Sequence, residues 1–94
     1  MKEHVERISD IMSEVEANWT ATDGGLTCAA TDVLRLGHRC LHDLDDLASW
    51  SVDQLKDELD STWAAVWRAQ TGAEGEILGA FAESLREELV RRGE

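Results

Sequence analysis

The chain has 94 residues, of which 20 are Asp or Glu and only 9 are Lys or Arg, so its formal net charge is −11 at pH 7. This length predicts one domain, residues 1–94, with one modest hydrophobic core. The acidic surface argues against direct binding to nucleic acid or anionic membrane and favours a basic surface on another protein. Four Trp residues and a hydrophobic fraction of 43% predict a folded chain rather than a disordered one.

The cellular compartment is predicted from the cysteines and from the first residues. Cys28 and Cys40 are the two cysteines, and we expect both to be reduced thiols. The first ten residues carry charges where a signal peptide needs an apolar run, and no segment has the roughly 18 consecutive apolar residues of a membrane span. We therefore expect a cytoplasmic protein.

A first helix is predicted over residues 2–19, because apolar residues recur there at spacings of three and four. Its apolar face is formed by Val5, Ile8, Ile11, Met12, Val15 and Trp19. Small polar residues and glycines over residues 20–25 are typical of a turn, so the helix is expected to end before Thr20.

A second helix is predicted over residues 27–48, with either Thr27 or Thr31 as its cap. Its apolar stripe is the clearest in the chain and consists of Val33, Leu34, Leu36, Cys40, Leu41, Leu44, Leu47 and Ala48. A stripe this wide is typical of a helix that packs against two neighbours.

Two further helices are predicted over residues 52–70 and 73–92. The third begins after a capping box, with Ser51 as the cap and Gln54 three positions inside, and its apolar face is Val52, Leu55, Leu59, Trp63, Val66 and Trp67. The fourth follows Gly72, and its apolar face is Ile77, Leu78, Phe81, Ala82, Leu85 and Leu89.

Four amphipathic helices with short connections predict an all-α, single-domain bundle of antiparallel helices. One alternative is that the third and fourth helices continue through Gly72 and Gly75 as a single kinked helix. That arrangement would open the bundle and favour a dimer.

Potential metal ligands are densest in the second helix. His38 and His42 lie one turn apart, and Asp45 continues the same row. A complete tetrahedral site needs a fourth ligand from elsewhere, and this row lies on the polar side of the helix. We therefore interpret it as a solvated face, expect no cofactor, and keep a helical metal-binding protein as an alternative.

The sequence gives no support for an enzyme. Cys40 belongs to the apolar stripe, whereas the neighbouring histidines His38 and His42 project elsewhere, so no activated nucleophile is predicted. The glycine-rich segments lack the lysine and the strand-to-helix context of a phosphate-binding loop. No Glu stands three residues before a His, as it does in helical di-iron sites.

Acidic residues concentrate around the junction of the second and third helices. Between residues 43 and 60 there are seven acids and Lys56 alone of opposite charge, with Trp50 in the middle. An acidic rim around an aromatic side chain is suited to a basic partner surface. The candidate partner-binding residues are Asp43, Asp45, Asp46, Trp50, Asp53, Asp57, Glu58, Asp60 and Trp67. Trp19 and Trp63 are predicted to be core residues.

These observations predict a non-enzymatic binding module or inhibitor whose acidic helical face occupies a basic surface of a partner protein, for example one that binds nucleic acid. A phage or mobile-element protein that mimics nucleic acid and blocks a host nucleic-acid enzyme would fit this description. The alternatives are a structural or regulatory homodimer, formed through Trp50, Trp67 and the edges of the third and fourth helices, and the metal-binding protein described above.

Overall fold

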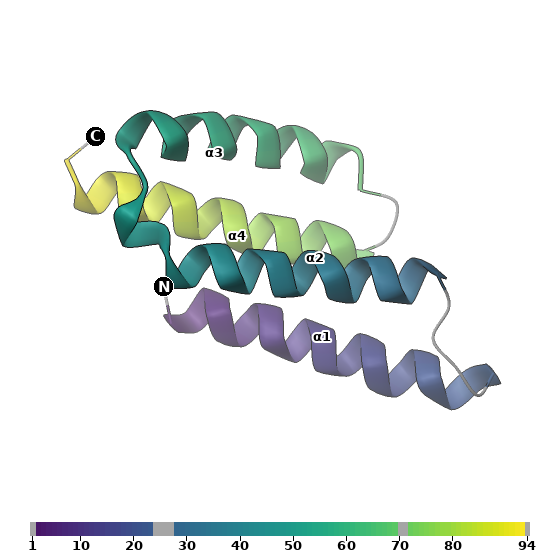
Figure 1. Ribbon diagram of the computed structural model, residues 1–94. Coiled ribbons are helices and arrows are strands. Elements are labelled where there is room, and N and C mark those ends of the chain that lie inside the picture. The colour runs from purple at the N-terminus through teal and green to yellow at the C-terminus, as the bar shows by residue number, and fades with distance from the viewer. Residues whose placement is uncertain (1, 24–27, 70–71, 94) are drawn as a thin grey trace.

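The computed structural model describes residues 2–23, 28–69 and 72–93, which form four α-helices and one short 3-10 helix (Figure 1). The elements are α1 (Lys2–Asp23), α2 (Cys28–Asp45), η1 (Leu47–Ser49), α3 (Val52–Trp67) and α4 (Gly72–Arg91). No strand occurs in the described residues. The predicted all-α fold of four helices is therefore confirmed.

The ends of the first three helices differ from the prediction. α1 continues to Asp23 rather than ending before Thr20, because Thr, Ala and Asp each cost at most about 0.7 kcal/mol in a helix. α2 ends at Asp45, and the residues that follow tighten into η1 rather than extending α2 to Ala48. α3 ends at Trp67, and the next two backbone N–H groups donate to Ala65 and Val66, three residues back, in the tighter pattern of a helix end.

α4 is the central helix of the molecule, because it packs against α1, α2 and α3. α2 packs against both α1 and α4, as its wide apolar stripe predicted. α3 and α4 lie side by side as two separate antiparallel helices (Figure 1), so the alternative of one kinked helix is wrong. Within the described part of the chain, α3 packs against no helix other than α4. The molecule is elongated, with extents of 48 × 24 × 16 Å.

The hydrophobic core joins α1, α2, η1 and α4, with one contribution from α3. Its completely buried side chains include Ile8, Val33, Cys40, Leu47, Leu55, Ile77, Phe81 and Leu85. α1 and α2 approach closely at Gly37, where a Cβ atom would lie only 2.4 Å from Sδ of Met12. A side chain at residue 37 would therefore force the Met12 side chain to move.

α3 is much less buried than the other helices, since only Leu55 and Thr62 are fully buried in it. Trp63, predicted to be a core residue, is 37% exposed, and Trp67 is 88% exposed. The prediction for Trp63 was wrong because α3 has a single neighbour, and one helix cannot cover the whole apolar stripe of another. Ala48, predicted on the apolar face of the second helix, lies in η1 instead and is exposed. The side chain of Trp19 lies outside the described residues.

Candidate protein-binding surfaces

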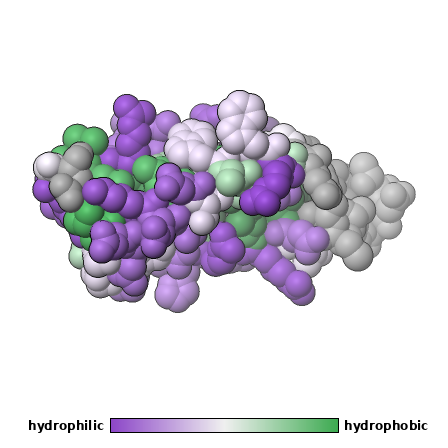
Figure 2. Space-filling view, turned by 90° about the horizontal axis from the view of Figure 1, so that it is seen from above, coloured by the Kyte–Doolittle hydropathy of each residue, from purple (hydrophilic) through white to green (hydrophobic). Residues whose placement is uncertain are grey.

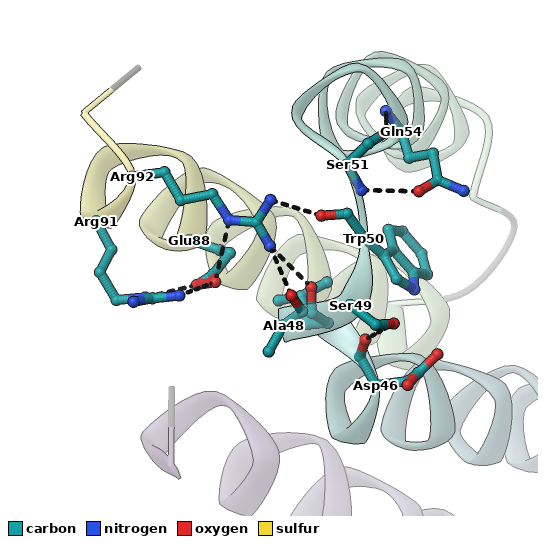
Figure 3. A network of polar contacts seen from close by, with 10 residues as sticks. Asp46, Ala48, Ser49, Trp50, Ser51, Gln54, Glu88, Arg91 and Arg92 are labelled. Atoms are coloured by element: carbon teal, nitrogen blue, oxygen red, sulfur yellow. Dashed lines mark hydrogen bonds and ion pairs between the residues drawn. The ribbon is translucent and has the colours of Figure 1, made fainter.

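The connection from α2 to α3 is held by local hydrogen bonds. The Ser51 hydroxyl accepts from the Gln54 backbone N–H at 3.1 Å, and the Gln54 side chain accepts from the Ser51 backbone N–H at 2.7 Å (Figure 3). The predicted capping box is therefore present. It satisfies two backbone donors that the start of a helix would otherwise leave without a partner. Trp50, the residue before the cap, thereby has a defined backbone position.

The Arg92 side chain fastens this connection to the end of α4. Its guanidinium group donates to the backbone carbonyl of Trp50 and to those of Leu47 and Ala48, the latter two at 3.2 Å. In Figure 3 the Trp50 indole extends to the side of the connection that faces away from Arg92. The carbonyl side of Trp50 is thus occupied by Arg92, which leaves the indole available to a different surface.

A buried carboxylate orients Arg92. Glu88 is only 3% exposed, and its carboxylate accepts from Arg91 and, at 3.4 Å, from Arg92 (Figure 3). The hydrogen bond from Arg91 is the main reason why the pKa of Glu88 lies below its usual value. We call the Glu88–Arg91–Arg92 group with its three carbonyl acceptors the Arg92 clamp.

Trp50 borders a surface hollow of about 270 Å³ that we call the Trp50 groove. Its lining residues are Trp50, Gln54, Asp57, Glu58 and Ser61. Gln54, Glu58 and Ser61 are spaced four and three residues apart, so they share one flank of α3. The Trp50 side chain is half-buried, with one part against the core and the rest at the groove. Trp50, Asp57 and Glu58, all predicted to bind a partner, are therefore brought together.

Asp43 does not line the Trp50 groove but lies on α2 near the buried Cys40. Burial raises the pKa of the Cys40 thiol to about 11, and the charges of Asp43 and Glu58 raise it further while that of Arg39 lowers it. Both carboxylates thus lie within electrostatic range of one buried thiol, although Asp43 belongs to α2 and Glu58 to α3. Cys40 is protonated at neutral pH, which is the state of a core residue rather than of a nucleophile.

The remaining acids of the run do not join the Trp50 groove. Asp45 lines a separate hollow of about 330 Å³, together with Glu87, Glu88 and Arg91 at the end of α4. Asp46 is exposed beside η1, and Asp53 and Asp60 are exposed on α3 without lining the groove. A run that is continuous in sequence is therefore divided in space.

The ion pairs between described residues lie away from the acidic run. They join His4 with Glu87, Arg86 with Glu83, and Glu88 with both Arg91 and Arg92. None of these pairs includes an acid from residues 43–60.

A second hollow of about 360 Å³ lies on the other flank of α3, between α1 and α3 with α4 as its floor. We call it the Trp63 groove, and its residues include His4, Arg7, Trp63, Glu76, Gly79 and Glu83. The exposed Trp67 lies one turn beyond Trp63 on the same flank. Figure 2 shows that the face carrying α3 is largely hydrophilic, so two exposed indoles are unusual on it.

The candidate metal ligands His38, His42 and Asp45 are all exposed on α2. Over the described ranges, no group of three or more His, Cys, Asp and Glu side chains is arranged to hold a metal ion. The metal-binding alternative therefore gains no support from the fold. The side chain of Cys28 lies outside the described residues.

Sequence reasoning missed Glu88 and Arg92 as structural partners, although their spacing contained a signal. Phe81, Leu85, Glu88 and Arg92 follow one another at intervals of four, three and four residues, so the two charged residues continue the buried row of α4. Two opposite charges in such a row indicate a paired, partly buried site. Gly79 and Arg7 were also missed, because only the packing of α1 beside α4 brings them to one groove.

No helix is long and apolar enough to cross a bilayer, within the part of the chain that the structure describes. Comparisons of the chain with protein-family models, with curated proteins and with solved structures give no match. The function is therefore inferred from the chemistry of the two grooves.

Proposed function

We propose that this chain is a non-enzymatic protein-binding module that captures a basic segment of a partner protein in the Trp50 groove. The observation that carries the proposal is the joint placement of the Trp50 indole with Asp57 and Glu58 around one hollow. An aromatic anchor with charged groups at its edge is a common composition of binding hot spots.

Arginine is the side chain that suits this groove best. Its planar guanidinium group stacks on an indole face and donates two parallel hydrogen bonds to a carboxylate. Lysine supplies the same charge but lacks the planar fork, so we expect an arginine-containing segment to bind more tightly than a lysine-containing one.

The Arg92 clamp supports this role because it fixes the backbone of Trp50 before any partner arrives. Immobilising a side chain on binding costs about 0.5–1.5 kcal/mol. A groove whose aromatic residue has a fixed backbone and a side chain already packed partly against the core avoids part of that cost. The capping box at Ser51 contributes in the same way from the other side of Trp50.

Nucleic-acid-binding proteins are the partner class that this charge favours, because they present basic surfaces that an acidic protein can occupy in place of the phosphate backbone. A net charge of −11 would also accelerate encounter with such a surface. An inhibitor that mimics nucleic acid, of the kind encoded by phages and mobile elements, is the biological role that we propose for this activity.

The test uses a short Ala-rich helical peptide with Arg at every fourth position, titrated into the protein by calorimetry. The groove variant is Asp57→Asn with Glu58→Gln, and the control is Asp45→Asn with Asp60→Asn. Each pair removes two of the 20 acids, so the net charge changes equally, from −11 to −9. We expect about tenfold weaker binding for the groove variant and less than about twofold for the control.

Equal weakening by the two variants would contradict the proposal, since total charge alone would then explain binding. A peptide with Lys in place of Arg should bind the wild-type protein more weakly. In the Trp50→Phe variant the affinities of the two peptides should differ less, because the larger aromatic face on which Arg stacks is lost. An Arg peptide that does not bind the wild-type protein at low salt would also contradict it.

A further inference from the structure

The flank of α3 that carries Trp63 and Trp67 is not explained by the proposed function. Trp67 is 88% exposed although a buried Trp side chain removes about 150–250 Å² from water. Trp63 is exposed one turn away, at the wall of the Trp63 groove. Two neighbouring indoles form an apolar patch whose contact with water is unfavourable.

A protruding side chain and a hollow are present side by side on this flank. Trp67 protrudes, and the adjacent Trp63 groove has a volume of about 360 Å³. Its floor includes Gly79, where an added Cβ atom would meet nothing within 4 Å. A two-fold interface requires the same patch to supply both the protrusion and its receptor. This flank meets that requirement.

The charges around the Trp63 groove are also compatible with self-association. His4 and Arg7 lie on the α1 side, whereas Glu76 and Glu83 lie on α4. A face with both signs can be complementary to itself. The Trp50 groove cannot, because its ionisable residues are Asp57 and Glu58 and two copies would repel each other there. Arg7 also provides a cation for the face of an incoming indole.

We propose that this flank is a two-fold interface between two copies of the chain, with Trp67 of each copy entering the Trp63 groove of the other. The partner is thus a second copy of this chain. The Trp50 grooves of both copies stay free in this dimer, because they lie on the opposite flank of α3. Each dimer would present two acidic binding sites.

Sedimentation equilibrium over a range of protein concentrations tests the dimer. Trp67→Glu should weaken dimerisation at least about 30-fold, the scale of a central aromatic residue in an interface. The control is Ser61→Glu, which adds the same charge to the opposite flank of α3 and should change dimerisation by less than about threefold. Because residue 67 is exposed, the free energy of unfolding should change little in the Trp67→Glu variant.

Gly79→Gln supplies an independent variant. The longer side chain would start at the floor of the groove, where a Cβ atom meets nothing within 4 Å in the monomer, and it replaces glycine by a better helix former. We expect a stable monomer. A Gly79→Gln protein that still dimerises like the wild type would show that the groove does not receive Trp67.

Salt distinguishes this interface from the Trp50 groove. Two copies with a charge of −11 repel each other, so raising the salt concentration should strengthen the dimer by screening that repulsion. Binding of the Arg peptide should instead weaken with salt. A wild-type chain that is monomeric at every concentration and salt would overturn the dimer while leaving peptide binding intact. An equal loss of dimer in Ser61→Glu and Trp67→Glu would overturn it as well.

Discussion

The two grooves beside α3 differ in the way their aromatic residues are held and in the charges around them. Trp50 is half-buried, and its carbonyl accepts from Arg92, whereas Trp63 and Trp67 are exposed. The ionisable residues that line the Trp50 groove are both acids, while those of the Trp63 groove have both signs. One helix therefore separates a surface suited to a basic partner from a surface suited to a second copy.

This difference originates in the position of α3. Because α3 packs against α4 alone, both of its flanks remain accessible. One flank borders Trp50 of the α2–α3 connection, and the other faces residues of α1 across the Trp63 groove. If three helices surrounded α3, the side chains of Trp63 and Glu58 would be buried and inaccessible to a partner. The sparse packing of α3 thus provides two surfaces on a chain with one small core.

Among the substitutions that test the difference between the two grooves, Arg92→Ala is expected to have the largest effect on stability. The substitution removes hydrogen bonds to three carbonyl groups and one contact to Glu88. We therefore expect the free energy of unfolding to fall by about 2–3 kcal/mol. The Trp50 indole N–H signal in a proton–nitrogen NMR spectrum should shift, because its backbone support is lost. The Trp63 and Trp67 signals should stay near their wild-type positions.

Arg91→Ala is the matched control for this measurement. Arg91 also contacts Glu88, but the carbonyls of the α2–α3 connection are bound by Arg92. Its loss should therefore leave the Trp50 signal in place. Movement of all three indole signals in Arg92→Ala would show that the clamp holds the whole fold rather than the Trp50 groove.

A smaller effect is expected from pH, acting through Glu88. Hydrogen bonds from Arg91 and Arg92 hold the pKa of Glu88 below the value of about 4.3 for an unfolded chain. Its contribution to stability is therefore fully present above that pH and is lost as the pH falls through the folded-state pKa. The difference in urea midpoint between wild type and Glu88→Gln should be largest near neutral pH and should shrink in acid.

Glu87→Gln provides the comparison for this pH series. The hydrogen bond from His4, at 2.9 Å, also lowers the pKa of Glu87, but the carboxylate is half exposed and its pair with His4 is screened by water. Glu87→Gln should therefore change the midpoint little at any pH. A pH dependence that is equally reduced in both variants would contradict the assignment to Glu88.

The features predicted correctly from the sequence are those that depend on residues close together in the chain. Helical spacing predicted four helices, and Ser51 with Gln54 predicted the start of α3. The wide stripe of α2 correctly predicted two neighbours. Each of these features follows from spacings of three and four residues, whatever the rest of the fold does.

The features that sequence reasoning missed depend on which helices touch. Trp63 had the spacing of a core residue, but nothing in that spacing shows that α3 has a single neighbour. Asp45 and Asp57 belong to one acidic run, yet η1 turns the chain so that they line different hollows. The Trp63 groove combines residues from both ends of the chain, such as Arg7 and Glu83, which helical spacing does not connect.

The smallest effect is expected at the floor of the Trp63 groove and is tested by comparing two glycines. Gly79→Ala should raise the free energy of unfolding of the monomer by about 0.5–1 kcal/mol, since its Cβ meets nothing and alanine favours the helix. Gly37→Ala should lower it by about 1 kcal/mol, because a Cβ 2.4 Å from the Met12 sulfur outweighs the same helical gain. Urea unfolding at low protein concentration measures both. If Gly79→Ala were also destabilising, the floor of the groove would be filled in solution and closed to Trp67.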